Sequence, residues 1–226
     1  MIKGMIFDLD GTILDSMEVW RNIDIEFLGK RGLAVPDDYL EAITPMGFLN
    51  AAIYTKERFG FPESPEEIEE EWLRMAEYDY ANKVELKPCA KEFLLKCKAE
   101  GIKLAVATSS LERLFVPCLQ HHDLCDLFEI AVTTRQAGAD KKSPRVYQMA
   151  ADALGLKPEE CVVFEDIVEG IRTAKAADFY AVGVYDVHSD RDRNNMVALA
   201  DRYLMSYEEV ATEDVATFLG KMKGNI

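Results

Sequence analysis

The amino-acid sequence predicts an α/β fold, in which a doubly wound, mostly parallel sheet carries a small all-helical domain inserted after strand 1. Three observations lead to this prediction. A short apolar strand begins the chain, a long stretch without strands follows it, and strands alternate with helices from about residue 85 onward. Such alternation is typical of βαβ units, whose right-handed crossovers build layered sheets. We therefore expect a core of residues 1–15 and 85–226 and a helical domain of residues 16–84.

The first strand is the apolar run at residues 5–7, which ends at two aspartates. Side chains alternate along a strand, so Asp8 and Asp10 should point to the same side. Gly11 then allows a sharp turn, because glycine tolerates positive φ. Open α/β sheets bind ligands at the carboxyl ends of their strands, and paired carboxylates are costly to bury without a cation or a proton between them. The first strand therefore predicts a metal site or a proton-transfer site.

The inserted segment predicts helices and no strand. Apolar residues recur at helical spacing from Met17 to Leu28, and a second helix covers about residues 46–59. The third helix has the clearest start, because Ser64 and Glu67 form the Ser-x-x-Glu pattern of a capping box. An insertion after the first strand lies above the carboxyl ends of the sheet, where it can act as a lid.

From about residue 86 the sequence predicts alternating strands and helices. The strands are expected at about residues 102–107, 129–133, 161–164, 180–184 and, more weakly, 202–205. The helices are expected at about residues 90–99, 111–120, 144–154, 167–177 and 207–220. With the first strand added, this order predicts one parallel sheet with helices on both faces.

The composition excludes several classes of protein. Acidic residues outnumber basic ones by 41 to 26, which disfavours a nucleic acid partner because its phosphates need basic contacts. No apolar stretch approaches the ~20 residues that cross a bilayer, so we expect no membrane partner. The five cysteines follow no metal-ligand spacing and, with no signal peptide, predict free thiols in the cytoplasm. We expect a monomer, because no exposed apolar face is evident.

Polar residues also follow the next two predicted strands of the core. Thr108 and Ser109 come directly after one strand and lead into a helix, whose free N–H groups can bind an anion. Lys141 lies in the loop after the other strand, just before a helix. We expect Ser143 to be the N-cap of that helix and Pro144 its first residue.

Two adjacent acids, Glu165 and Asp166, follow the next strand and open another helix. Taken alone, such groups are ordinary features, because hydroxyls cap helices, lysines are solvated and acids complement a helix dipole. The pair Asp8 and Asp10 also lacks the further alternating ligands and the distal glutamate of a calcium loop. Together, however, four strand ends supply the carboxylates, the hydroxyl and the lysine that phosphoryl transfer requires.

These residues together resemble the motifs of the haloacid dehalogenase superfamily, and the resemblance covers the whole chain. The run 8–12, Asp-Leu-Asp-Gly-Thr, is similar to the first motif, which is the most specific one. Thr108 is similar to the second motif, Lys141 to the third, and Glu165 with Asp166 to the fourth. The helical insertion is similar to the small cap of the family. The resemblance implies a Mg²⁺-dependent phosphatase with an aspartate nucleophile.

The resemblance also implies a role for each acidic residue. Asp8 would attack phosphorus and form an aspartyl-phosphate, which divides a difficult hydrolysis into two steps. Asp10 would protonate the leaving alcohol and then deprotonate water. Mg²⁺ would be held by an Asp8 oxygen, the Asp10 backbone carbonyl and Asp166, with Glu165 as a further ligand or a neighbour of these ligands.

The remaining motif residues are implied to hold the phosphoryl group. Thr108, the backbone N–H of Ser109 and Lys141 would stabilise the phosphoryl oxygens as charge develops. Loss of one such donor typically costs ~3–4 kcal/mol in the transition state. Lys141 would also offset the crowded carboxylates, without which Asp8 would resist ionisation.

Differences between branches of the family favour a phosphatase. The dehalogenase and phosphonate-cleaving branches lack the second aspartate, whereas Asp10 is present here. The β-phosphoglucomutase-like branch is more similar, but its cap usually offers a histidine where this chain has Trp20, and an arginine near Gly47 that has no clear counterpart. A sugar-phosphate mutase is the alternative. A non-catalytic regulator is less favoured, because it would not require Asp10.

We therefore expect a phosphatase acting on a small phosphorylated metabolite. The cap residues expected to contact this substrate are Glu18, Trp20, Met46 and Gly47, although a helical aromatic such as Trp20 is more often part of a core. These residues are too generic to identify the substrate. A further departure is Asp178, which stands at a helix end where the family usually has glycine, and aspartate tolerates the left-handed conformation there.

Overall fold

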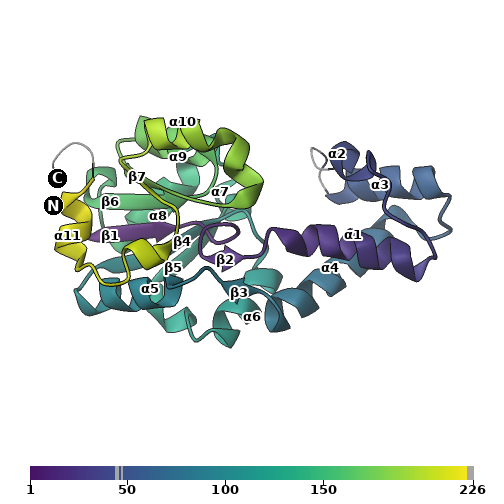
Figure 1. The fold of residues 1–226 in the computed structure, drawn as a ribbon, viewed down its shortest axis with the longest axis horizontal. Coiled ribbons are helices and arrows are strands. Elements are labelled where there is room, and N and C mark those ends of the chain that lie inside the picture. Colours follow the sequence, from purple (N-terminus) through teal and green to yellow (C-terminus); the bar gives the residue numbers. More distant parts are fainter. Residues whose placement is uncertain (44–45, 47, 223–226) are drawn as a thin grey trace. The chain divides into compact units, whose positions relative to one another are not determined.

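The computed structural model describes residues 1–43, 46 and 48–222. The chain divides into two compact units, one of Met1–Ser16 and Glu85–Ile226 and the other of Met17–Val84. The first unit is a sheet flanked by helices, and the described residues of the second form helices and no strand (Figure 1). No helix among the described residues is long and apolar enough to cross a membrane.

The larger unit contains a six-stranded sheet in which all neighbouring strands are parallel. In spatial order the strands are β5 (Ile130–Thr133), β4 (Lys103–Thr108), β1 (Gly4–Phe7), β6 (Cys161–Glu165), β7 (Tyr180–Val184) and β8 (Arg202–Leu204). The direction of winding reverses at β1, and such a reversal leaves a crevice outside the carboxyl ends of the strands. The predicted doubly wound α/β fold is confirmed, and β4 to β8 begin and end within one residue of the expected positions.

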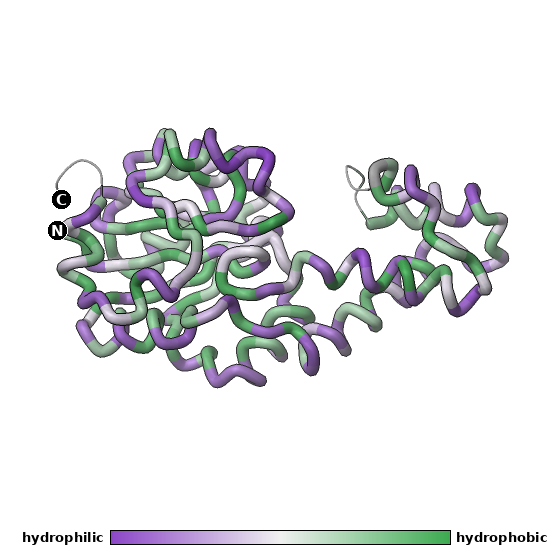
Figure 2. The backbone as a smooth tube through the Cα atoms, in the orientation of Figure 1, coloured by the Kyte–Doolittle hydropathy of each residue, from purple (hydrophilic) through white to green (hydrophobic). Residues whose placement is uncertain are grey.

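One face of this sheet packs against an aliphatic layer of helices. Ile6 and Val163 point into it from neighbouring strands, and the buried cluster also contains Val146, Ile171 and Met196 from the helices. Hydrophobic residues run along the central strands (Figure 2). The helices of this layer are α8 (Arg145–Leu154), α9 (Val168–Ala176) and α10 (Arg193–Leu199).

The opposite face is aromatic, as expected when side chains alternate along each strand. Phe7 follows Ile6 and stacks on Phe164 with ring centroids 4.3 Å apart. Phe93 and Phe218 complete this layer, with centroids 5.2 Å apart. These two rings come from α5 (Ala90–Ala99) and α11 (Val215–Gly220). Both faces of the strands are therefore buried, which explains their continuous apolar sequences.

The structure adds short elements that the sequence pattern does not predict. β2 (Leu14–Asp15) pairs antiparallel with β3 (Glu85–Leu86), and a two-residue strand is too short to show a period. The loop from β7 to β8 contains α10. The other elements of this unit are α6 (Glu112–His121), α7 (Thr134–Ala137) and the 3-10 helices η1 (Cys125–Leu127), η2 (Pro158–Glu160), η3 (Val187–Asp192) and η4 (Tyr207–Glu209).

The predicted continuous helix at residues 207–220 is wrong. The chain instead forms η4, a turn and then α11, which begins at Val215. Asp214 is the reason for the late start, because its side chain accepts a hydrogen bond from the Thr217 N–H at 2.6 Å. Ser206 does the same at η4, where its hydroxyl accepts from the Glu208 N–H at 3.1 Å. Two local caps thus divide one apolar pattern into two short elements.

The smaller unit is held together by aromatic packing. Phe27 and Trp72 lie with ring centroids 5.4 Å apart, and the guanidinium of Arg31 lies 3.8 Å from the Phe27 ring centre. The predicted capping box is confirmed, because the Ser64 hydroxyl accepts from the Glu67 N–H and the Glu67 carboxylate accepts from the Ser64 N–H. The helices are α1 (Glu18–Lys30), α2 (Tyr39–Ile43), α3 (Phe48–Phe59) and α4 (Pro65–Asn82).

Candidate active site

Asp8 comes directly after β1, at the point where the winding of the sheet reverses. Its N–H continues the parallel pairing by donating to the Phe164 carbonyl at 3.0 Å. The chain then turns at Gly11, whose φ of +78° is the left-handed conformation expected for this glycine. Both aspartates lie beyond the last strand residue, so strand alternation does not govern Asp10 as the sequence analysis assumed. Asp10 is instead placed by Ser16, whose hydroxyl donates to Asp10 Oδ1 at 2.6 Å.

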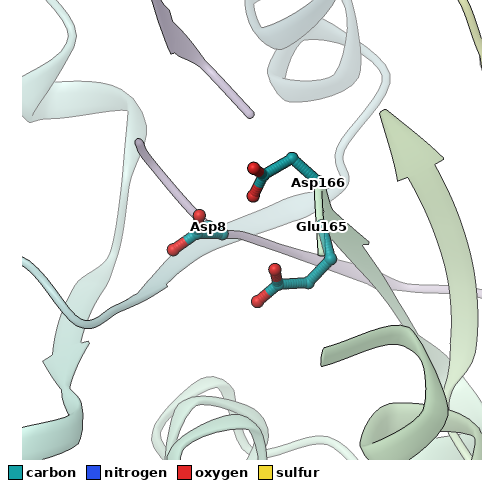
Figure 3. Close-up of side chains that lie close together, drawn as sticks. All are labelled: Asp8, Glu165 and Asp166. Carbon is teal, nitrogen blue, oxygen red and sulfur yellow. The ribbon is translucent and has the colours of Figure 1, made fainter. Parts of the chain in front are cut away.

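Three buried carboxylates gather at this edge of the sheet. Asp8 follows β1, while Glu165 ends β6 and Asp166 follows it. One oxygen from each of the three lies within 4.8 Å of the others, and the carboxylates turn toward a shared space (Figure 3). None of the three residues is more than 4% exposed. Oxygen ligands at this spacing suit a divalent cation such as Mg²⁺.

Lys141 brings a positive charge to these carboxylates. Its ammonium pairs with Asp8 Oδ1 and with Glu165 Oε1, the latter at 2.6 Å. Burial by itself would lower the pKa of Lys141, but the carboxylates of Asp8 and Glu165 outweigh burial and raise it. The lysine therefore stays charged at neutral pH.

One lysine does not balance the whole cluster. Burial raises the pKa of Asp8 well above its usual range, and the neighbouring carboxylates add to this effect, although Lys141 opposes it. Burial, followed by the charge of Glu165, raises the pKa of Asp166 to about 7. The second oxygen of Glu165, Oε2, is buried and has no hydrogen-bond partner among the described residues. These carboxylate oxygens fit a bound divalent cation. Its charge would lower the pKa values of Asp8 and Asp166, and it would give Glu165 Oε2 a partner.

Hydroxyl groups surround the carboxylates. The Thr12 hydroxyl lies 3.5 Å from Asp8 Oδ2 and 3.4 Å from Asp166 Oδ1, and its single hydrogen can be donated to either carboxylate. Ser189, in η3, lies 3.4 Å from Asp166 Oδ2. Thr12 belongs to the first motif, but the sequence analysis gave neither residue a role, because a hydroxyl in a turn or loop shows no periodic signal.

The helix start near Lys141 differs from the prediction by one residue. Ser143 is not the N-cap and Pro144 is not the first helical residue, because α8 begins at Arg145 and Pro144 occupies the N-cap position. The Ser143 hydroxyl still accepts from the Arg145 N–H, at 3.4 Å. Lys141 thus lies in the loop before α8, where its side chain reaches the carboxylates.

A family model for haloacid dehalogenase-like hydrolases matches residues 2–178 of the chain. These residues include all four clustered groups, Asp8, Lys141, Glu165 and Asp166.

This chain belongs to that family, and it is an enzyme of the hydrolase class.

Named proteins of the family are similar over almost the whole chain. Hexitol phosphatase A of Escherichia coli strain K12 is 31% identical over 214 residues, which are 92% of this chain and 93% of that protein. Protein CbbY of Rhodobacter capsulatus is 27% identical over 224 residues, which are 95% of this chain and 97% of that protein. The crystal structure of CbbY from Rhodobacter sphaeroides in complex with phosphate superimposes with a TM-score of 0.76 at 25% identity, covering 96% of this chain and 98% of that one.

The second motif of this haloacid dehalogenase-like hydrolase lies at the end of β4. Thr108 is fully buried there, and its hydroxyl accepts a hydrogen bond from the Ser110 N–H at 3.0 Å. Ser109 is exposed. β4 is the direct neighbour of β1, so Thr108 and Asp8 end adjacent strands. The Thr108 hydroxyl is thus hydrogen-bonded within its own turn. Among the described residues it forms no hydrogen bond with the acidic cluster.

The candidate substrate residues lie in the helical unit of the hydrolase. Glu18 pairs with Arg21 at 3.6 Å, and the Trp20 ring packs against Phe48 with centroids 4.9 Å apart. Met46 is half-buried, and Gly47 lies outside the described residues. The contact of Trp20 with Phe48 agrees with an ordinary packing role for this aromatic residue.

Sequence reasoning also missed a buried contact between the acidic cluster and α8. Tyr147, on α8, donates a hydrogen bond from its hydroxyl to Glu165 Oε1 at 2.7 Å. In the sequence, Tyr147 falls on the apolar face of a helix and is indistinguishable from a core residue. The signal that could have drawn attention to it is its hydroxyl, because a buried tyrosine usually has a hydrogen-bond partner.

Proposed function

We propose that this hydrolase is a Mg²⁺-dependent phosphatase that acts on a small phosphorylated sugar or polyol through an aspartyl-phosphate. The observation that carries the proposal is the position of Asp8. Its buried carboxylate pairs with Lys141 and belongs to the acidic cluster with Glu165 and Asp166. Asp10, two residues later, instead accepts a hydrogen bond from the Ser16 hydroxyl. Two carboxylates in such different surroundings suit two different tasks.

Asp8 is proposed as the nucleophile. Its Oδ1 faces the ammonium of Lys141, and its Oδ2 lies near the Thr12 hydroxyl. One carboxylate oxygen would attack phosphorus, the bond from phosphorus to the alcohol oxygen would break, and the phosphoryl group would remain on Asp8. Lys141, together with bound Mg²⁺, would favour the ionised form of Asp8 and reduce the repulsion between the carboxylates and the incoming phosphate.

Asp10 is proposed as the general acid and base. It would give its proton to the leaving alcohol oxygen and then accept a proton from the water that hydrolyses the aspartyl-phosphate. The hydroxyl of Ser16 holds one of its oxygens at 2.6 Å, which fixes the direction of the carboxylate. Such orientation is part of the rate advantage, since a misplaced acid does not reach the leaving oxygen.

Asp8, Asp166, the Asp10 backbone carbonyl and Glu165 are proposed to hold Mg²⁺. When bound, the ion supplies positive charge beside the phosphoryl oxygens. The buried Oε2 of Glu165, which has no partner in the part of the chain that the structure describes, and the raised pKa of Asp166 both support a cation at this place. Mg²⁺ prefers oxygen ligands of this kind.

Thr108, the Ser109 N–H and Lys141 are proposed to bind the phosphoryl oxygens. Support for this comes from the parallel pairing of β4 with β1, which places the end of β4 next to Asp8. The turn that follows β4 leads to α6, and free N–H groups before a helix favour an anion.

The helical unit is proposed as the cap that selects the substrate, with Glu18, Trp20, Met46 and Gly47 as the candidate contacts. The substrate class rests on the relatives, because hexitol phosphatases are among the similar proteins. We further propose that the enzyme is monomeric and cytoplasmic, and the five free thiols support the cytoplasmic location.

The test is phosphate release from a panel of sugar, polyol and nucleotide phosphates, with Mg²⁺ and with a chelator. Release from at least one sugar or polyol phosphate, dependent on Mg²⁺ and abolished by Asp8→Asn, supports the proposal. Unchanged release in Asp8→Asn would contradict the covalent mechanism. Silence across the panel, with bisphosphate-dependent isomerisation of a hexose phosphate, would instead indicate a mutase.

A further inference from the structure

The two carboxylate oxygens of Glu165 have different environments. Oε1 receives the Lys141 ammonium at 2.6 Å and the Tyr147 hydroxyl at 2.7 Å. Oε2 is equally buried but has no hydrogen-bond partner among the described residues. A buried carboxylate oxygen without a partner is costly, so this oxygen needs a ligand from outside the chain.

Gly170 lies directly against the Glu165 side chain. It lies inside α9, where glycine is less favourable than alanine. A Cβ atom at this position would lie 2.6 Å from Glu165 Cδ and 2.9 Å from Glu165 Oε1. The absence of a side chain at Gly170 therefore gives the Glu165 carboxylate its room.

We infer that the Tyr147 hydroxyl and the bare Cα of Gly170 form a socket that fixes Glu165 Oε1 beside Lys141 and leaves Oε2 turned to the metal cluster. Tyr147 and Gly170 are then positioning residues of the cation site, acting through Glu165. The inference rests on the proposed function, because it takes the cluster of Asp8, Glu165 and Asp166 as the Mg²⁺ site (Figure 3). Groups that orient metal ligands in this way commonly change metal affinity about 10–100-fold when they are removed.

The simpler explanation is that Tyr147 only fills the core. A second tyrosine of the same unit separates the two explanations. Tyr207 is also almost fully buried and also lies within electrostatic reach of Asp8 and Asp166, but its hydroxyl has no hydrogen-bond partner among the described residues. Tyr147→Phe and Tyr207→Phe thus remove the same atom from two buried tyrosines, and only the first removes a bond to Glu165.

The experiment measures Mn²⁺ binding, as a paramagnetic substitute for Mg²⁺, by electron paramagnetic resonance on the full-length wild type, Tyr147→Phe, Gly170→Ala and Tyr207→Phe. Circular dichroism first establishes that each protein is folded. We expect Tyr147→Phe and Gly170→Ala to bind Mn²⁺ about 10-fold or more weakly and Tyr207→Phe to bind as the wild type does. Saturating Mg²⁺ should restore much of the turnover of Tyr147→Phe, which a merely structural defect would not allow.

Three results overturn the inference while leaving the phosphatase intact. These are wild-type affinity in folded Tyr147→Phe, an equal loss in Tyr207→Phe, and failure of Tyr147→Phe to fold, which marks a structural role. A wild-type protein that binds no Mn²⁺ and releases no phosphate overturns the inference together with the proposed function. The activity of the wild type therefore distinguishes the two failures.

Discussion

Lys141 is the residue on which the buried cluster depends for charge balance. It is 7% exposed and contacts both Asp8 and Glu165. Removing one partner of a buried ion pair leaves the other charge without compensation, and this costs about 3–5 kcal/mol. The stability of the core and the chemistry of the site are therefore coupled through one ammonium group.

We predict that Lys141→Ala lowers the free energy of unfolding by about 3–5 kcal/mol in the presence of a chelator, as measured by urea denaturation. Mg²⁺ should recover part of this loss, because it supplies positive charge to the same carboxylates. Lys142→Ala is the matched control, since the neighbouring Lys142 is exposed and should cost little. Equal effects of the two substitutions would show that the ion pairs of Lys141 carry no stability.

Asp24 is a buried acid of the helical unit that the mechanism does not use. Burial raises its pKa to about 7, and Tyr39 is its hydrogen-bond neighbour. The Thr55 hydroxyl donates to the Ala51 carbonyl at 2.7 Å, so the Tyr39 hydroxyl, 2.7 Å from Thr55 Oγ1, gives its proton to Thr55. The contact with Tyr39 lowers the pKa of Asp24, but burial outweighs this contact.

This arrangement predicts a pH-dependent stability. The folded pKa lies above the unfolded one, so the folded state binds more protons between about pH 4 and pH 7 and stability falls as pH rises through that window. The loss approaches about 1.4 kcal/mol per unit of raised pKa. Asp24→Asn should reduce this fall in chemical denaturation series at several pH values and leave the part due to Asp8 and Asp166, whose pKa values are also raised, whereas the exposed control Asp37→Asn should keep the full fall. Parallel profiles for wild type and Asp24→Asn would contradict the assignment.

At the scale of elements, the sequence predicted turns and caps formed by neighbouring residues, but not the contacts between side chains of different elements. The turn at Gly11 and the capping box at Ser64 follow from residue types over a few positions, and both are confirmed. The contact of Tyr147 with Glu165 joins residues from two elements, and helical periodicity only says that such a tyrosine is buried. The helix predicted across Asp214 failed because an apolar pattern does not show which polar side chain will cap.

The end of α9 offers an element-scale prediction. Asp178 has a φ of +66° and follows the helix, and the Phe179 N–H donates to the Ala174 carbonyl at 3.1 Å, as in a Schellman motif. A residue other than glycine is strained in this conformation by about 1 kcal/mol, although aspartate tolerates it better than most. Asp178→Gly should therefore raise the melting temperature slightly and Asp178→Ala should lower it, in thermal denaturation. A lower melting temperature in both variants would mean that the Asp178 side chain itself stabilises the helix end.

For the whole molecule, the topology of the sheet brings the site together. Asp8, Lys141 and Glu165 are far apart in the sequence, but β1 pairs directly with β6 and their carboxyl ends coincide. The net charge of −15 does not attract an anionic substrate, so local positive charge must do so. The sequence was sufficient for the doubly wound, mostly parallel sheet, because parallel α/β topology follows a few rules. It was insufficient for side-chain contacts such as the bond between Ser16 and Asp10.

The most direct test of the central claim is to trap the phosphorylated enzyme. Asp10→Asn should still react with acetyl phosphate, because acetate leaves without needing a proton, but it should hydrolyse the aspartyl-phosphate slowly because the base is missing. We predict that mass spectrometry finds one phosphoryl group on the peptide that contains Asp8, and that Asp8→Asn combined with Asp10→Asn carries none. A phosphoryl group on another residue, or continued phosphate release from the double variant, would contradict Asp8 as the nucleophile.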